Sequence, residues 1–137
     1  MSENDCIFCA IAAGDGPAEI LDSDEHTVSF MDINPATRGH ALVIPKRHSA
    51  DLLEIDQSDL EHCSVAAKRL ADRIKETLEP DGINLLNCCG SAAWQTVFHF
   101  HMHVVPRWEG DPLELPWTPS EGNMDEIKQT AKRIRGE

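Results

Sequence analysis

Residues 98–105 alternate large apolar side chains with histidines, and this pattern constrains the fold more than any other part of the chain. Because side chains alternate across a β-strand, His99, His101 and His103 are expected on one face and the apolar residues on the other. Packing in a core explains the apolar face, whereas three of the chain's seven histidines on one face require a chemical explanation. The segment predicts a strand with a functional face, which Pro106 ends.

Three explanations of the histidine face compete. It could be an ordinary polar face, a site where all three rings share one metal ion, or a site where one imidazole acts as a nucleophile. The Cα atoms of His99 and His103 lie roughly 13 Å apart in an extended strand, and zinc–nitrogen bonds are only about 2.1 Å long, so one shared ion is geometrically awkward. A neutral imidazole held at one nitrogen presents the other as a nucleophile. Gln95 and Thr96, just upstream, could position a phosphate, and we favour this third explanation.

The apolar pattern also predicts three further strands and two helices. The strands are expected at residues 27–31, 40–45 and 83–87. The long helix is expected at residues 58–79, with Ser58 as its N-cap, because apolar residues recur there every three or four positions. A short helix is expected near residues 125–133. Strands joined by hairpins, together with one long helix, predict an α+β domain with an antiparallel sheet.

The five cysteines favour a metal site over a disulfide framework. Their number is odd, and no export signal accompanies them. Cys6 and Cys9 form a C-x-x-C motif, whose two thiolates could hold one side of a zinc ion or act as a redox pair. No strand precedes the motif, as the redox alternative would require. We therefore expect a metal ion whose remaining two ligands are histidines.

The charge balance limits the partners and suggests the environment of the protein. The chain has 24 acidic and 12 basic residues, a net charge of −12, which repels nucleic acid and anionic membranes. Lysine is scarce as well, and molar salt screens acidic self-repulsion because the Debye length falls to about 3 Å. The longest apolar run, residues 6–13, is too short to cross a bilayer, and the first residues lack the basic region of a secretory signal. We expect a protein of a salt-rich cytoplasm whose stability depends on salt.

Three blocks of sequence together resemble the histidine triad (HIT) superfamily of nucleotide hydrolases and transferases. The blocks are FMDINP at residues 30–35, GHALVIPKRH at residues 39–48 and QTVFHFHMHVVPR at residues 95–107. The resemblance covers residues 6–107 and implies that residues 1–137 form a single HIT domain with a C-terminal tail at 108–137. It implies an α+β fold in which an antiparallel sheet of about five strands accompanies one long helix and a shorter C-terminal helix.

The resemblance further implies a Hint-like hydrolase acting on purine nucleoside phosphoramidates or related nucleotide conjugates. His101 would attack the α-phosphorus and form a nucleotidyl-histidine intermediate, His103 would contact the phosphate and His40 would support both. The substrate would be bound by Ile7, Phe8, Phe30, Asp32 and Ile33 around the nucleoside and by Gln95 and Thr96 near the phosphate. Two alternatives remain: a dinucleoside polyphosphate hydrolase, and a non-catalytic nucleotide-binding or scaffolding dimer.

The resemblance also implies a cofactor and a partner. Members with this C-x-x-C motif bind structural zinc, here through Cys6, Cys9, His48 and His99. They are typically homodimers, for which the helix at residues 58–79, with its small residues Ala66 and Ala67, is a plausible contact surface. The alternative is that the apolar face of this helix only covers its own sheet. Two positions depart from the family pattern: Cys88 replaces a usual asparagine, and Trp94 replaces a common glycine. Asn87 precedes Cys88, but a shift of one residue reverses the facing of a side chain in a strand.

Overall fold

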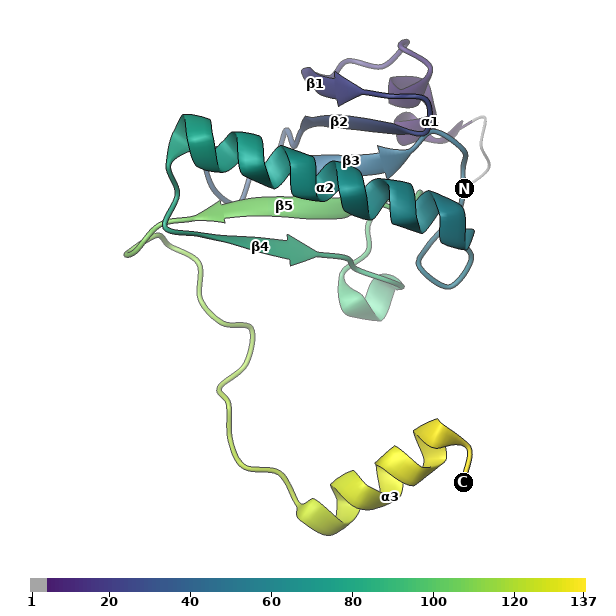
Figure 1. The fold of residues 1–137 in the computed structure, drawn as a ribbon, viewed down its shortest axis with the longest axis vertical. Helices are drawn as coiled ribbons and strands as arrows, with labels where there is room; N and C mark the ends of the chain where they lie inside the picture. Colours follow the sequence, from purple (N-terminus) through teal and green to yellow (C-terminus); the bar gives the residue numbers. More distant parts are fainter. Residues whose placement is uncertain (1–4) are drawn as a thin grey trace.

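Five antiparallel strands form one sheet that has a helix on each of its two faces (Figure 1). The computed structural model describes residues 5–137. The prediction of no secretory signal rests on the first residues of the chain, and residues 1–4 lie outside the described part. The strands, in spatial order, are β1 (Ile20–Ser23), β2 (Thr27–Met31), β3 (Ala41–Pro45), β5 (Met102–Arg107) and β4 (Gly82–Leu86). The predicted α+β class with about five strands is confirmed.

Helix α2 (Gln57–Leu78) covers one face of the sheet. Its buried stripe packs on the strands; it comprises Cys63, Ala66, Ala67, Leu70 and Ile74. Ala66 and Ala67 are buried against the chain's own sheet, so the apolar face of α2 covers that sheet and these two residues are not available to a second copy. The predicted N-cap is wrong: the cap is Asp56, whose carboxylate pairs with Arg47 and makes no capping bond.

Helix α1 (Ile7–Ala12) packs on the opposite face of the sheet. Phe8 and Ile11 bury their side chains against Phe30 and Leu42. Neither α1 nor β1 is predicted from the sequence. The six residues of α1 are all apolar or small, so they show no amphipathic period, and all four residues of β1 are exposed.

The histidine segment is a regular strand over only part of its length. Strand β5 begins at Met102 and continues through Pro106 to Arg107, so the predicted span of 98–105 is wrong at both ends. The amide of Phe100 donates to the carbonyl of Ser49 (2.7 Å) instead of joining the sheet. The predicted alternation nevertheless holds, because Phe100 packs under α2 whereas the ring of Phe8, from α1, contacts the rings of both His99 and His101.

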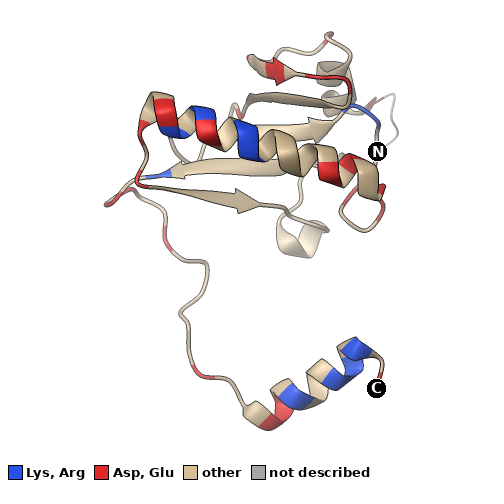
Figure 2. Ribbon diagram, in the orientation of Figure 1, with Lys and Arg blue, Asp and Glu red and all other residues tan. Residues whose placement is uncertain are grey.

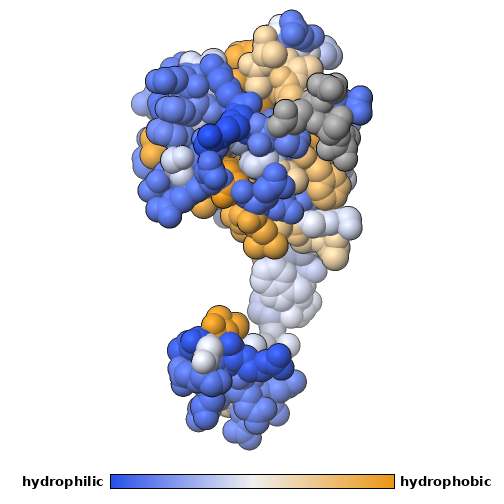
Figure 3. Space-filling model, turned by 90° about the vertical axis from the view of Figure 1, so that its right-hand side faces the viewer, coloured by the Kyte–Doolittle hydropathy of each residue, from blue (hydrophilic) through white to orange (hydrophobic). Residues whose placement is uncertain are grey.

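The C-terminal tail leads away from the sheet to α3 (Met124–Arg135), a helix that lies apart from the body (Figures 1 and 3). Asn123 caps it by accepting a hydrogen bond from the amide of Glu126 (3.0 Å). The helix exposes Met124, Ile127 and Ile134, and its last turns are basic although the chain as a whole is acidic (Figure 2). Within residues 5–137, no helix is long and apolar enough to cross a membrane.

Candidate active site

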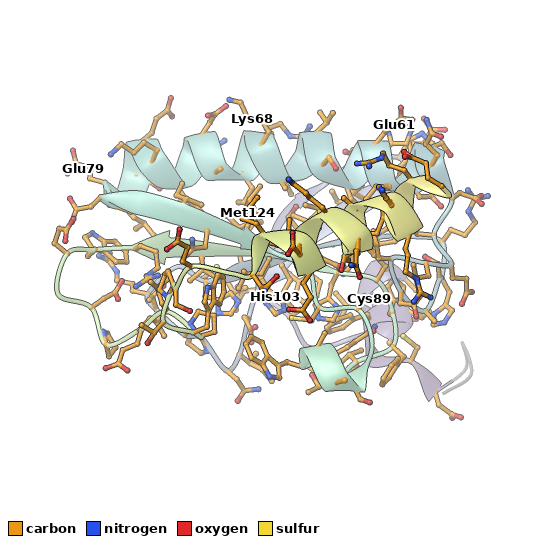
Figure 4. The ribbon with its side chains drawn as sticks, turned by 90° about the horizontal axis from the view of Figure 1, so that it is seen from below. Glu61, Lys68, Glu79, Cys89, His103 and Met124 are labelled. Carbon is orange, nitrogen blue, oxygen red and sulfur yellow. The ribbon has the colours of Figure 1, made fainter. Side chains whose placement is uncertain are left out.

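A cavity of about 440 Å³ lies beside α1, on the histidine face of the sheet. The structure brings together around it the predicted nucleoside-binding residues Ile7, Phe8, Phe30, Asp32 and Ile33, as well as Thr96. The three predicted catalytic histidines, His40, His101 and His103, line the same cavity, and Figure 4 labels His103 on β5. A larger cavity of about 540 Å³ lies between α2 and strands β1 and β2, but among the described residues none of the predicted site residues lines it.

Among the described residues, Nδ1 of His101 has a hydrogen-bond partner and Nε2 has none. Its Nδ1 lies 2.8 Å from the carbonyl oxygen of His99, and because a carbonyl only accepts, Nδ1 carries the proton. In the neutral ring Nε2 then has an unshared electron pair. Burial lowers the pKa of His101 below its ordinary value, which keeps the ring neutral near pH 7. The side chain of Asn87 donates to the carbonyl of His101 (2.9 Å) and holds its backbone in place.

His40 and His103 form a chain of hydrogen bonds whose direction is set by a backbone amide. The amide of Ala36 donates to Nδ1 of His40 (2.9 Å), so the proton of neutral His40 is on Nε2. That nitrogen lies 2.9 Å from Nδ1 of His103. His103 therefore accepts at Nδ1 and carries its own proton on Nε2, which makes this nitrogen a donor.

The environment keeps both of these rings neutral. Burial, together with nearby His101 and His40, lowers the pKa of His103 to about 4. Burial also lowers the pKa of His40, although Asp32 opposes this effect. A carboxylate oxygen of Asp32 lies 3.4 Å from Nε2 of His40, while its other oxygen accepts from the amide of Asn34 (2.8 Å).

The low pKa of His103 predicts that acid destabilises the protein. An unfolded histidine takes up a proton near pH 6.5, whereas folded His103 does so near pH 4. The unfolded chain therefore binds more protons in this window, and the free energy of unfolding should fall as the pH drops from about 6.5 to about 4. Urea unfolding at several pH values, with the metal content measured at each, tests this. A His103→Gln variant should show a smaller fall; an identical fall contradicts the prediction.

The four predicted metal ligands meet in one cluster. The Sγ atoms of Cys6 and Cys9 each lie 3.4 Å from Nδ1 of His99, and Sγ of Cys9 lies 3.3 Å from Nδ1 of His48. Tetrahedral zinc places sulfur and nitrogen ligands roughly 3.6 Å apart. Nε2 of His99 donates to the carbonyl of Pro45 (2.8 Å), which leaves Nδ1 unprotonated and available to a metal. Two thiols and two imidazoles at these distances fit a metal ion such as zinc.

A second group of potential ligands does not fit a metal. Asp32, His40 and His103 also place their ligand atoms within 4.8 Å of one another. A metal bound to Nε2 of His40 would require the ring proton on Nδ1, where the amide of Ala36 already donates. Two donors cannot face each other, so this group is a hydrogen-bonded chain and not a metal site.

The side chain of Gln95 cross-links the loop before the histidine segment through hydrogen bonds to backbone groups. The side-chain nitrogen of Gln95 donates to the carbonyls of Ala50 (2.8 Å) and Val97 (3.1 Å), and its oxygen accepts from the amide of Gly90 (2.7 Å). Gln95 is buried and does not line the cavity, unlike Thr96. The amide of Ala36, which donates to His40, could not be predicted from the sequence either, because every residue except proline has a backbone N–H.

The two positions that depart from the family pattern lie outside the cavity. Trp94 has a left-handed backbone (φ 74°), follows the short helix η2 (Ser91–Ala93) and is 71% exposed. A left-handed tryptophan is strained where glycine is not. Cys88 and Cys89 (Figure 4 labels Cys89) are half-buried free thiols. Within the described residues, the hydrogen bonds of His101 involve neither Trp94 nor Cys88, because its partners are the carbonyl of His99 and the side chain of Asn87.

Known proteins that are similar to this chain carry the HIT domain, to which the clustered histidines also point. The family model of the HIT domain matches residues 13–110. A Bacillus subtilis relative, Protein hit, is 42% identical over 113 residues, which are 82% of this chain and 78% of the relative. A Streptococcus mutans structure is 37% identical with a TM-score of 0.93, over 98% of this chain and 86% of that one.

Two further solved structures are described by what they bind. A zinc-bound histidine triad family protein from Mycobacterium smegmatis is 38% identical, with a TM-score of 0.78 over 99% of this chain and 100% of that one. A histidine triad nucleotide-binding protein from Candida albicans is 32% identical, with a TM-score of 0.85 over 96% and 95% of the two chains. Since the family match begins directly after α1, continues past the end of β5 and includes His99, His101 and His103, this chain belongs to the HIT family.

Proposed function

We propose that the chain is a nucleotide hydrolase that cleaves purine nucleoside phosphoramidates at the α-phosphorus through a nucleotidyl-histidine intermediate. The observation that carries the proposal is the ring of His101, which is neutral, held at Nδ1 by the carbonyl of His99 and lines a cavity. A nitrogen with an unshared pair in such a place is a nucleophile. The name of the Candida albicans relative, a nucleotide-binding protein, supports a nucleotide as the ligand.

The cavity suits a nucleoside in size and chemistry. Its volume of about 440 Å³ is within the usual range for small-molecule sites. The side chains of Ile7, Phe8 and Phe30 offer apolar surfaces to a purine ring. The carboxylate of Asp32 retains acceptor capacity beyond its bond from the amide of Asn34, which is what the hydroxyl groups of a ribose require.

The proposed reaction has two steps. Nε2 of His101 bonds to the α-phosphorus while the P–N bond of the substrate breaks, and the leaving nitrogen takes the electron pair and a proton from solvent. The imidazole becomes cationic, and the carbonyl of His99 stabilises this charge at Nδ1–H. Water then attacks the phosphorus and releases a proton, the bond to Nε2 breaks, and the mononucleotide leaves. Throughout, Nε2–H of His103 donates to a phosphate oxygen.

We infer that Cys6, Cys9, His48 and His99 hold a structural zinc ion. When bound, zinc would link the start of α1, the loop after β3 and the start of the histidine segment. His99 connects the two sites, because its ring belongs to the metal cluster and its carbonyl orients the nucleophile. The zinc-bound Mycobacterium smegmatis relative supports the choice of metal.

We also infer a homodimer formed through the open edge of the sheet. Strand β4 pairs only with β5 among the described residues and exposes about half of both Leu85 and Leu86. An exposed apolar edge strand is a template for a second chain. Sedimentation velocity should give twice the 15.2 kDa mass of the chain, and Leu86→Asp should shift it towards the monomer. A monomeric wild type contradicts this inference.

Release of AMP from adenosine 5′-phosphoramidate tests the proposed function directly. We expect turnover by the wild type, and faster turnover in molar KCl than in dilute buffer, because the net charge of −12 needs screening. The salt dependence tests the further proposal of a salt-rich cytoplasm. Dinucleoside polyphosphates are measured beside the phosphoramidate, since a preference for them would assign the chain to the alternative substrate class.

A further inference from the structure

Thr37 ties the turn at residues 36–40 to the end of β5, although its side chain does not line the active-site cavity. Its hydroxyl donates to the carbonyl of Pro106 (2.7 Å). The last pair between β3 and β5 joins Ala41 to Val104, so Pro106 lies beyond the end of β3. The Thr37 hydroxyl thus bonds a β5 carbonyl that β3 no longer reaches.

Two further features close the turn tightly. The amide of His40 donates to the carbonyl of Thr37 (3.2 Å), and Gly39 has a left-handed backbone (φ +88°). A Cβ atom on Gly39 would lie only 2.5 Å from a methyl carbon of Leu78 and 3.2 Å from the ring of Pro106. The turn is therefore packed against α2 and β5, with no room for a side chain at this position.

The position of this turn, together with the Asp32 carboxylate 3.4 Å from Nε2 of His40, determines which nitrogen of His103 carries a proton. The amide of Ala36, at the start of the turn, donates to Nδ1 of His40, and His40 in turn donates to Nδ1 of His103. If Ala36 moved away, His40 could carry its proton on Nδ1 and accept at Nε2. His103 would then donate from Nδ1 and present an unshared electron pair at Nε2. Such a pair repels the anionic oxygen of a phosphate, which a proton at Nε2 attracts.

We propose that Thr37 is a positioning residue for His103, acting through the amide of Ala36 and the ring of His40. The effect on catalysis rests on the proposed function, whereas the effect on the tautomers does not. Within the described part of the chain, Thr37 makes no hydrogen bond to either ring, and its hydroxyl donates to the carbonyl of Pro106. Loss of this bond would let the turn move and allow both tautomers of the pair.

Three variants test the proposal. Thr37→Val removes the hydroxyl with little change in shape, Thr37→Ser restores it, and Thr77→Val is the matched control. The hydroxyl of Thr77 also donates to a backbone carbonyl at 2.7 Å, that of Arg73, but at an exposed position of α2. Nitrogen-15 NMR of the histidine rings reports the tautomers, and hydrolysis of adenosine 5′-phosphoramidate gives kcat and KM.

In the wild type, both rings should carry the proton on Nε2. Thr37→Val should populate the other tautomers and lower kcat about tenfold, with a smaller effect on KM, because the donor at the phosphate is misplaced. Thr37→Ser should restore the wild-type spectrum and rate, and Thr77→Val should change neither. Unchanged tautomers in a folded Thr37→Val protein, or an equal loss of rate in Thr77→Val, overturn the proposal.

A second variant serves if Thr37→Val does not fold. Ala36→Pro deletes the donating N–H itself, while Ala36→Gly retains it. Tautomers that remain unchanged in a folded Ala36→Pro protein also overturn the proposal. A wild type that shows both Nε2–H tautomers yet hydrolyses none of the substrates contradicts the proposed function alone, because the link from Thr37 to His103 is then decided by the spectra.

Discussion

Replacing His101 by alanine should abolish release of AMP from adenosine 5′-phosphoramidate while leaving AMP binding nearly unchanged. The variant lacks the only nitrogen proposed to bond to the phosphorus, so the rate should fall by at least about a thousandfold. The apolar walls of the cavity and the carboxylate of Asp32 remain, so the affinity for the nucleotide should persist. Turnover assays and calorimetric titration with AMP, on the same preparations, measure the two quantities.

The outcome separates the three functional alternatives. His62→Ala is a suitable control, because His62 is an exposed histidine that stacks on His26, away from the cavity. Equal turnover in the wild type and His101→Ala would remove His101 as the nucleophile. If neither protein turns over phosphoramidates or dinucleoside polyphosphates but both bind AMP, the chain is a binding protein. The departures at Cys88 and Trp94 would then be the first positions to restore.

Replacing Cys9 by serine should remove most of the metal and destabilise the fold. The wild type should contain about one zinc ion per chain. A structural zinc ion contributes several kcal/mol, and 1 kcal/mol corresponds to a few degrees in a domain of this size, so the Tm should fall by about 10 °C. Turnover should fall as well, because His99 would lose the support that holds its carbonyl against the ring of His101.

Cys88→Ser is the matched control for the metal site. Cys88 is also a partly buried free thiol, but it does not belong to the metal cluster. Its replacement should retain zinc and leave the Tm within a few degrees of the wild type. A wild type that is metal-free and equally stable with or without added zinc would rule out the site. The C-x-x-C motif would then have to be tested as a redox pair.

Several features of the site follow from local sequence alone. Alternation of side chains depends only on an extended backbone, so the common face of His99, His101 and His103 is predictable even though regular pairing begins at Met102. The apolar period of α2 is likewise local. The metal ligands were reached through the family resemblance, because the C-x-x-C motif alone leaves the other two ligands open.

Other features were decided only by tertiary structure. The amide of Phe100 bonds to the carbonyl of Ser49, 51 residues earlier in the chain, and this contact keeps the part of the histidine segment before Met102 out of the sheet. Gln95, predicted near the phosphate, instead bonds three backbone groups of its own surroundings. Which groups a backbone carbonyl or amide meets depends on segments far apart in the sequence, so no local pattern reports it.

The contrast between local sequence and tertiary structure also explains the chemistry of the histidines. The sequence by itself determined that three imidazoles share a face and that two thiols are spaced for a metal. Only the folded chain decided which nitrogen of each ring is protonated, because the carbonyls of Pro45 and His99 and the amide of Ala36 make that choice. The residue type determines only that a histidine ring can both donate and accept a hydrogen bond. Which ring nitrogen donates is set by backbone groups that long-range packing brings within hydrogen-bond distance.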